Sequence, residues 1–215
     1  NTVNEKCLVL VPDKNYIETF SDKLTTIQWL KAKKIDYPKT EDLGKQSNFS
    51  YLERTLIVPF IVKPKIGKGS VDLLIIENEE QFKSIKNKKL FIAQQLIGDD
   101  NSEYTCGIYK SRYGYTEIIV MRRLLKNGST IMAEVEDNKV VYDYCKQIAD
   151  AINTTGPFNI QLRLCNNTHK PFCFEVNMRL SGTTAIRHNF GFKDCQVWIK
   201  ENLFDESFHH NFNIK

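Results

Sequence analysis

The chain has 215 residues, of which 41% are hydrophobic and 26% are charged, and its formal net charge is +4. This length is sufficient for one globular domain, or two small lobes, with a buried core. No segment approaches the roughly 18 consecutive apolar residues of a membrane span, and the basic residues do not gather into the face of a nucleic-acid binder. We therefore expect neither a membrane protein nor a nucleic-acid-binding protein.

The six cysteines are scattered along the chain and show no spacing typical of a zinc site. Scattered cysteines of this kind usually act as buried thiols in a reducing compartment, so we expect a cytoplasmic protein. Because the first residue is Asn1 rather than methionine, we also expect a processed form or a fragment of a longer protein.

The first half of the chain alternates β-branched runs with polar breaks, which predicts short strands and two helices. The predicted strands cover residues 7–11, 56–64, 71–76 and 90–97. The predicted helices cover residues 23–33 and 78–86, and Ser21 and Asp22 offer an N-cap to the first of them.

The second half of the chain predicts four further strands and two further helices. Its predicted strands cover residues 103–109, 115–124, 159–164 and 171–176, and its predicted helices cover residues 139–153 and 196–203. Hairpins as well as helices join the strands. The pattern therefore favours an α+β fold with antiparallel sheets over a doubly wound parallel sheet.

A loop rich in glycine and lysine joins two of the predicted strands, from Lys65 to Ser70. Glycines allow a backbone to approach a phosphate closely, and lysines supply positive charge. The loop lacks the spacing of a Walker A motif. Two interpretations stay open for it, a phosphate-binding hairpin and a structural hairpin with surface lysines.

Polar side chains share one face of two later strands. Glu175, Asn177 and Arg179 alternate along one strand, and Gln161 lies on the strand before it. Carboxylate and amide oxygens suit Mg²⁺, which completes its shell with phosphates and water, and Arg179 could hold a phosphate. The alternative is a polar strand face that is only solvated.

A third candidate is the segment from Gln94 to Ile97, with Glu103 after the acidic loop. A strand that turns into a loop can present backbone amide and carbonyl groups to a purine edge, and a nearby carboxylate can accept hydrogen bonds from ribose hydroxyls. The alternative is an ordinary strand and loop.

In this order, the segments resemble the ATP-grasp superfamily, most closely the branch that includes the large subunit of carbamoyl phosphate synthetase. The resemblance extends roughly from Asp22 to Phe204. It is carried by residues 22–23, 35–40, 59–64, 94–98, 103–105, 156–161 and 174–182. The resemblance implies an ATP-grasp fold, in which two α+β lobes clamp ATP between antiparallel sheets.

The resemblance also implies roles for individual residues. The residues it assigns to ATP are Lys23, Lys63, Lys65, Gly67, Lys68, Gly69, Ser70, Gln94, Gln95, Leu96 and Glu103. Gln161, Glu175 and Asn177 would hold one or two magnesium ions, or manganese as a substitute. Arg179 would act as the catalytic residue at the transferred phosphoryl group. Gln161 and Gln94 stand where many members carry an acidic residue.

The implied function is an ATP- and Mg-dependent carboxylate–amine ligase that acts through an acyl phosphate. Candidate substrate contacts are Arg122, Arg123 and Arg187, with surface or sheet-edge charges as the alternative. The competing hypothesis is a non-catalytic ATP-binding module, or a subunit that needs another domain for its substrate. The substrates would be a small carboxylate and an amine, whose identities the sequence leaves open.

The resemblance predicts a domain organisation as well. Residues 1–20 would be the remnant of a preceding α/β domain, residues 21–110 the small lobe with the glycine–lysine hairpin, and residues 111–215 the large lobe with the metal site. This organisation suggests that the chain pairs with a second copy of itself, as a homodimer, or with an N-terminal domain that the sequence lacks.

Overall fold

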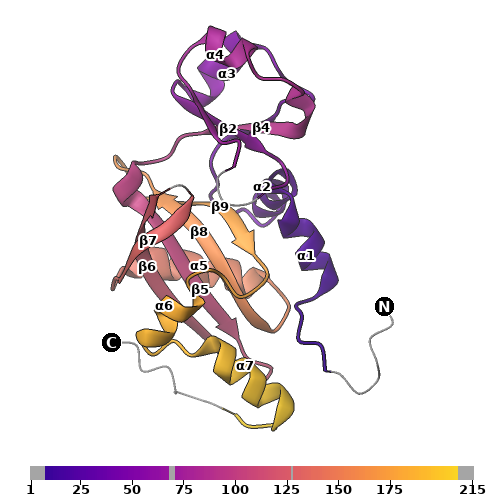
Figure 1. Ribbon diagram of the computed structural model, residues 1–215, viewed down its shortest axis with the longest axis vertical. Helices are drawn as coiled ribbons and strands as arrows, with labels where there is room; N and C mark the ends of the chain where they lie inside the picture. The colour runs from indigo at the N-terminus through magenta and orange to yellow at the C-terminus, as the bar shows by residue number, and fades with distance from the viewer. Residues whose placement is uncertain (1–7, 68–70, 127, 208–215) are drawn as a thin grey trace.

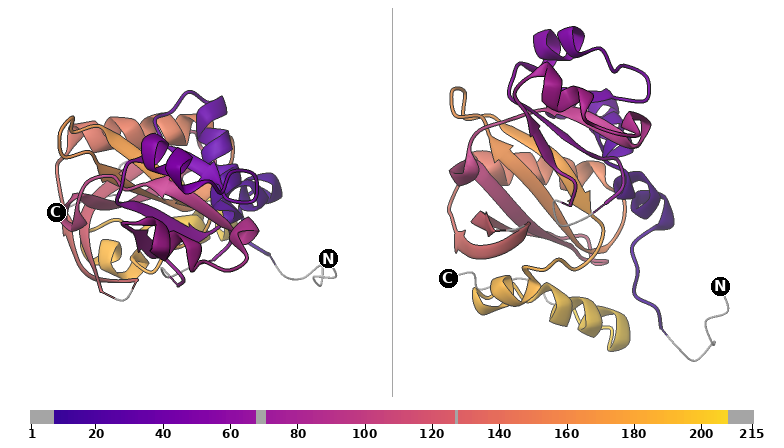
Figure 2. Two further views of the ribbon diagram at one scale, coloured as in Figure 1. Left: turned by 90° about the horizontal axis from the view of Figure 1, so that it is seen from above. Right: turned by 45° about the horizontal axis from the view of Figure 1, so that its top comes forward.

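Two antiparallel sheets organise the chain in the computed structural model, which describes residues 8–67, 71–126 and 128–207 (Figure 1). The smaller sheet lies over one end of the larger one, as the two views of Figure 2 also show. The structure thus has the α+β class and the paired antiparallel sheets that the sequence predicts. Within the described ranges, no helix combines the length and the apolar character needed to span a membrane.

The smaller sheet has four strands in the order β1-β4-β2-β3. They are β1 (Thr40–Asp42), β2 (Phe60–Pro64), β3 (Leu74–Ile76) and β4 (Phe91–Gln95). Helices α3 (Phe49–Leu56) and α4 (Glu79–Lys83) cover one face, where Leu52, Phe60 and Phe82 are buried together. These elements form the four-stranded lobe.

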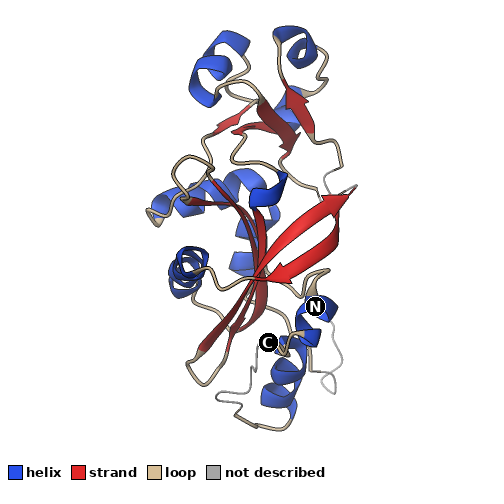
Figure 3. Cartoon of the chain, turned by 90° about the vertical axis from the view of Figure 1, so that its left-hand side faces the viewer, coloured by secondary structure: helices blue, strands red, loops and turns tan. Residues whose placement is uncertain are grey.

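The larger sheet has five strands in the order β7-β6-β5-β8-β9. They are β5 (Glu103–Lys110), β6 (Thr116–Lys126), β7 (Ser129–Val135), β8 (Gly156–Leu164) and β9 (Pro171–Asn177). Helices α1 (Lys14–Ser21), α2 (Lys23–Ala32) and α5 (Lys139–Ala151) pack on one face. Helices α6 (Thr184–Asn189) and α7 (Asp194–Leu203) lie against the other face, so helices flank this sheet on both sides in Figure 3. These elements form the five-stranded lobe.

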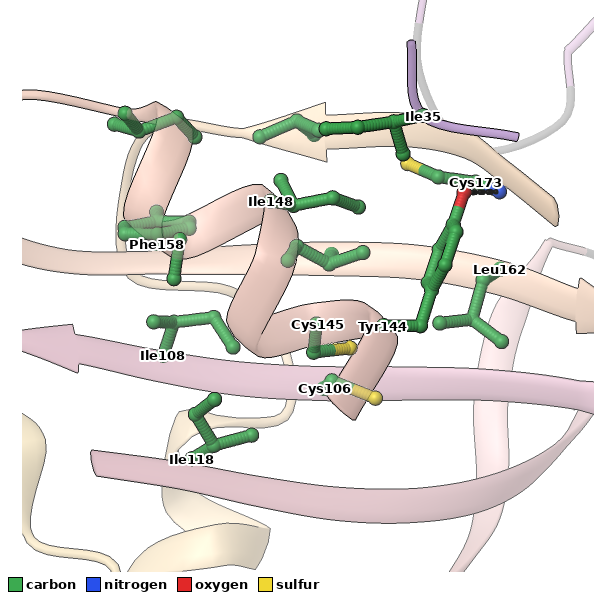
Figure 4. Close-up of a cluster of buried hydrophobic side chains, with 14 of the residues drawn as sticks. Ile35, Cys106, Ile108, Ile118, Tyr144, Cys145, Ile148, Phe158, Leu162 and Cys173 are labelled. Carbon is green, nitrogen blue, oxygen red and sulfur yellow. Dashed lines mark hydrogen bonds between the residues drawn. The ribbon is translucent and has the colours of Figure 1, made fainter. Parts of the chain in front are cut away.

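The main core lies between α5 and the larger sheet (Figure 4). Helix α5 turns Val141, Tyr144, Cys145 and Ile148 toward the sheet, which is the i, i+3, i+4, i+7 pattern of an amphipathic helix. Each large apolar side chain buried in this way contributes on the order of 2 kcal/mol. The hydroxyl of Tyr144 accepts a hydrogen bond from the Cys173 amide at 2.8 Å and so joins α5 to β9.

Asparagine and aspartate side chains begin several helices. The Asp22 carboxylate accepts from the Leu24 amide at 2.7 Å and starts α2 as predicted. Asn48 accepts from the Tyr51 amide at 2.9 Å and starts α3. Leu56, predicted as the first residue of a strand, is therefore the last residue of a helix, because a capped segment with Leu52 and Leu56 on one face can be buried as a helix.

Two segments, residues 33–39 and 96–102, connect the lobes. They meet at the four-stranded lobe, where the amide of Gln95, the last residue of β4, donates to the Lys39 carbonyl at 2.9 Å. At the far side of the four-stranded lobe, the Lys23 amide donates to the Lys65 carbonyl at 2.8 Å. The lobes are therefore joined by a double connection and by this backbone contact to the start of α2.

Several boundaries differ from the prediction. Of the strand predicted at residues 7–11, Cys7 lies outside the described residues, and Leu8 to Val11 form no strand, since no described strand pairs with them and Leu8, Val9 and Val11 are exposed. Only Leu74–Ile76 of the strand predicted at 71–76 pairs with β2. The elements that the sequence did not predict are α1, β1, α3, β7 and α6.

The division between the sheets falls between Gln95 and Glu103. It precedes the boundary predicted near residue 110 by one strand, because β5 pairs with β6 and β8 rather than with β4. Helices α1 and α2 also pack on the larger sheet, through Phe20, Ile27 and Leu30. The assignment of residues 1–20 to a preceding domain stays a prediction.

Candidate functional site

A cleft of about 460 Å³ lies between the two sheets and is lined by residues of both lobes. On the four-stranded lobe, Ile61, Lys63 and Gln94 line it, while their strand neighbours Phe60 and Val62 point into the core beneath α3 and α4. This division follows the period of two along a strand.

All five strands of the five-stranded lobe contribute residues to the cleft, and β5, β8 and β9 line it with polar side chains. On β8, Asn159, Gln161 and Arg163 face the cleft, while Ile160 and Leu162 face α5. The strand register pairs Gln161 with Thr105 on one side and with Glu175 on the other. Asn159 pairs in the same way with Asn177. The predicted polar face on β8 and β9 is thus present, and it is extended by β5.

Two lysines approach the cleft from the four-stranded lobe and α2. Lys63 is 7% exposed, and its ammonium lies 5.0 Å from the centre of the Phe174 ring. Burial lowers the pKa of Lys63 to about 8, although the nearby Glu175 acts in the opposite direction. The Lys23 ammonium donates to the Gly67 carbonyl at 3.0 Å, so it is anchored beside the glycine loop.

A buried carboxylate organises one end of the cleft. Arg123 Nε and Nη2 donate to Glu103 Oε1 at 3.1 and 2.7 Å. On the other side, Arg163 Nε donates to Glu103 Oε2 at 2.9 Å, with Arg163 Nη2 2.8 Å from the same oxygen. Arg123 Nη2 also donates to Gln161 Oε1 at 2.9 Å. Glu103 therefore fixes two guanidinium groups, both on the cleft wall.

The opposite end is a chain of side chains that leaves β9. Asn177 Nδ2 donates to Glu175 Oε1 at 3.1 Å, and Arg179 Nη2 donates to Asn177 Oδ1 at 3.1 Å. Arg179 lies two residues beyond the end of β9 and is exposed, yet it still lines the cleft. The three residues predicted to share one site are thus hydrogen-bonded in sequence.

Oxygen atoms at this end suit a hard cation that is also held by phosphates. Glu175 supplies one carboxylate and Asn177 one amide oxygen, and both line the cleft. The amide oxygens of Gln161 and Asn177 already accept hydrogen bonds from Arg123 and Arg179, so a cation would have to replace these contacts. Within the part of the chain that the structure describes, no group of three or more histidine, cysteine, aspartate or glutamate side chains could hold a metal alone.

Several predicted site residues lie outside the cleft. Lys65 points away from it to form an ion pair with Asp42 at 2.6 Å. Arg122 projects from the face of β6 opposite to Arg123 and pairs with Glu134 at 2.8 Å, as the alternation along a strand requires. Leu96 does not line the cleft, whereas Ile97 does. Lys68, Gly69 and Ser70 lie outside the described residues.

Arg187 was predicted as a substrate contact, but it is fully buried and pairs with Asp194. It is too deep to meet a substrate in this conformation. Other lining residues were not predicted, namely Thr105, Asn159, Arg163, Phe174, Ser181 and Thr183. Asn159 and Arg163 could have been found, since they continue the alternation of Gln161 along β8.

The chain matches one protein-family model and is similar in fold to many solved structures. The family model described as "ATP-grasp in the biosynthetic pathway with Ter operon" matches residues 86–206. No curated protein sequence matches the chain.

Among solved structures, carboxyaminoimidazole ribonucleotide synthase from Aspergillus clavatus, complexed with ATP, has a TM-score of 0.81 and 12% identity over 95% of this chain and 57% of that one. N5-carboxyaminoimidazole synthetase from Staphylococcus aureus, complexed with ADP, has a TM-score of 0.70 and 15% identity over 81% of this chain and 48% of that one. L-amino acid ligase from Bacillus licheniformis has a TM-score of 0.65 and 17% identity over 86% and 48%. The likeness is one of fold, and the chain spans about half the length of these proteins.

Proposed function

This chain belongs to the ATP-grasp family, and on that premise we propose that it binds ATP in the cleft and acts as an ATP-dependent carboxylate–amine ligase. The charge of the cleft carries this proposal. Five cationic side chains line it, against the two carboxylates of Glu103 and Glu175, which leaves an excess of three positive charges. The five are Lys23, Lys63, Arg123, Arg163 and Arg179. A polyphosphate matches such an excess, whereas a neutral ligand does not.

The adenosine would lie against the connection between the lobes. Gln94 Nε2 donates to Thr40 Oγ1 at 2.8 Å, while Thr40 Oγ1 donates to the Pro38 carbonyl at 2.7 Å. Because the single hydroxyl proton of Thr40 is used in this way, the Gln94 amide must be the donor to it, and its carbonyl oxygen is left for a ligand. Ribose hydroxyls would bind Glu103 in exchange for part of its arginine contacts.

The phosphates would lie between the lysines and the end of β9. Lys63 is suited to bind them, because a desolvated ammonium interacts more strongly with a phosphate than an exposed one does. Glu175 and Asn177, with Gln161, would hold magnesium, which supplies neutralisation of the phosphate charge. Arg179 would bind the transferred phosphoryl group through two parallel hydrogen bonds, as guanidinium groups commonly do.

The proposed reaction has two steps. An oxygen of the substrate carboxylate attacks the γ-phosphorus, the bond to the β-phosphate oxygen breaks, and ADP leaves. The amine then attacks the carbonyl carbon of the acyl phosphate, loses a proton and displaces inorganic phosphate. Positioning and charge stabilisation by Lys63 and Arg179 supply the catalysis, so no protein nucleophile is required.

A second candidate function is an ATP-binding module that needs another domain or chain for its substrate. The coverage of the solved structures favours it, since the chain spans only 48–57% of the three proteins compared above. In that case ATP binds in the same cleft, and turnover requires the additional part.

The test is the release of ADP and phosphate with magnesium and a panel of carboxylate and amine pairs. The chain is compared with Glu175→Ala and with Glu53→Ala, a control on the exposed side of α3. Turnover that depends on one pair, and is lost only in Glu175→Ala, supports the ligase. ATP binding without turnover on any pair supports the module, and the absence of ATP binding contradicts both.

A further inference from the structure

Arg187 is a fully buried arginine whose guanidinium joins three separate segments of the five-stranded lobe. Its Nη2 pairs with Asp194 Oδ2 at the start of α7. Its Nη1 donates to Ser181 Oγ at 3.1 Å and to Asn159 Oδ1 at 3.4 Å, although the second bond is long. Ser181 and Asn159 both line the cleft, and Arg187 lies directly behind them.

The sheet provides space for this guanidinium at Gly107. A Cβ atom added to Gly107 would lie 2.9 Å from both Cδ and Nη1 of Arg187. Gly107 is the partner of Asn159 in the pairing of β5 with β8. The arginine is thus pressed against the sheet at the level of Asn159, and a larger residue on β5 would displace it.

The two contacts of Nη1 reach both sides of the end of β9. Asn159 is the strand partner of Asn177. Ser181 holds the turn that follows Arg179, because its hydroxyl lies 2.8 Å from Thr183 Oγ1 and its amide donates to Thr184 Oγ1 at 3.1 Å. Displacement of Arg187 would therefore loosen the segment that carries Asn177 and Arg179.

A buried ion pair adds little to stability, since well-packed apolar side chains of similar volume often stabilise a fold equally or more. Arg187 Nε and Asp194 Oδ1 even lack hydrogen-bond partners among the described residues. What arginine provides, and an apolar side chain or a lysine does not, is a planar fork that fixes several acceptors at once.

We infer that Arg187 is a positioning residue that fixes the phosphate-binding end of the cleft through Ser181 and Asn159. This inference rests on the proposed function, because it assumes that phosphates bind beside Asn177 and Arg179. The adenosine end is separate from it: Glu103 lies four residues from Gly107 along β5, a distance of about 13 Å. Substitution of Arg187 should therefore weaken the binding of the phosphates and leave the binding of the nucleoside unchanged.

The experiment compares the binding of adenosine with that of a non-hydrolysable ATP analogue plus magnesium, by calorimetry. In Arg187→Lys we expect the affinity for the analogue to fall about tenfold, because misplacement of Arg179 would cost about one charge-assisted hydrogen bond to the phosphates. The affinity for adenosine should change less than about twofold, as is usual for sites that are distant from the substitution. The thermal midpoint is recorded for each variant. Arg112→Gln, an arginine in the β5–β6 turn that pairs with Asp205, is the matched control.

Gly107→Ala is the second variant, because it displaces the guanidinium without removing it and keeps the test valid if Arg187→Lys does not fold. We expect the same selective loss, smaller in size. An equal loss for both ligands, or no loss for either, overturns the inference. The proposed function is tested by the unchanged chain alone: if that chain binds neither adenosine nor the analogue, the proposed function fails, whatever the variants do.

Discussion

The two walls of the cleft differ in how their polar groups are held. On the five-stranded lobe, Glu103, Arg123, Arg163 and Gln161 form one hydrogen-bonded network. On the four-stranded lobe, no ion pair or hydrogen bond joins the Lys63 ammonium to another described side chain, and the lysine rests over the Phe174 ring. We call the five-stranded side the assembled wall, because protein groups hold its two guanidinium groups, whereas the Lys63 ammonium on the opposite wall has no such partner among the described side chains.

The largest effect is expected where the assembled wall loses its central carboxylate. Glu103→Gln removes the charge that compensates Arg123 and Arg163, which are buried to 9% and 18% exposure. Breaking a buried ion pair costs about 3 kcal/mol, because a charge remains uncompensated. We expect the free energy of unfolding in urea to fall by about that amount. A loss below about 1 kcal/mol would mean that this wall is not held by the network.

For Lys63 on the opposite wall, we expect a substitution to change ligand affinity rather than folding stability. In Lys63→Met we expect the affinity for ATP to fall about 100-fold, since a buried ammonium makes strong charge-assisted hydrogen bonds to phosphate. Stability should stay equal or rise, because burying an unpaired charge is unfavourable. Calorimetry and thermal unfolding measure the two effects, with Lys83→Met on α4 as the exposed control. Loss of stability in Lys63→Met would remove the contrast between the walls.

The pH dependence of ATP binding sharpens the same contrast. Only the ammonium form of Lys63 binds phosphate, and its pKa is about 8 rather than 10.5. The affinity should therefore be nearly constant below about pH 7 and fall about tenfold between pH 7 and pH 9.

Folding stability should change in the other direction over that range. The folded chain releases this proton more readily than the unfolded chain does, so the contribution of Lys63 to stability rises with pH between about 8 and 10.5. Lys63→Met should bind ATP with little dependence on pH in this range, and a persistent tenfold fall in that variant would assign the titration to another group.

The smallest effect is expected at Arg122, which belongs to neither wall. Its side chain is 41% exposed on the face of the sheet away from the cleft, where the guanidinium pairs with Glu134 of β7 and with Glu136. Exposed ion pairs contribute roughly 0–1 kcal/mol, so Arg122→Gln should change stability by less than about 0.5 kcal/mol and leave ATP affinity unchanged. Weaker ATP binding in this variant would return Arg122 to the candidate ligand contacts.

Much of the fold could be predicted because it depends on local patterns. Alternation along β8 and β9, the helical spacing of Val141 to Ile148 and the Asp22 cap are all readable from neighbouring residues. The resemblance to the ATP-grasp superfamily is confirmed by the family match. The carbamoyl phosphate synthetase branch stays a prediction, since the structures compared above belong to other ligases.

The failures depend on contacts between residues distant in sequence. The resemblance to relatives suggested Arg187 as a substrate contact, but Gly107 leaves room for its side chain in the interior and Asp194 pairs with it there. Lys65 belongs to a lysine-rich loop, yet Asp42 on another strand pairs with it. Gly107 and Asp42 are distant in sequence from Arg187 and Lys65, so the local pattern does not show these contacts. The roles assigned to the cleft residues in nucleotide and metal binding remain predictions.

The double connection between the lobes has a mechanical consequence. Residues 33–39 and 96–102 both cross between the lobes, and the hydrogen bond from the Gln95 amide to the Lys39 carbonyl ties them together where they meet the four-stranded lobe, so we expect the lobes to rotate about this pair of connections. At the opposite rim, the hydrogen bonds from Lys23 to Lys65 and Gly67 act as a clasp. The cleft should open by rotation of one lobe relative to the other, and the hydrogen bonds from Lys23 to Lys65 and Gly67 should break first. Lys23, a predicted phosphate contact, would then contact both the opposite lobe and the ligand when the cleft is closed.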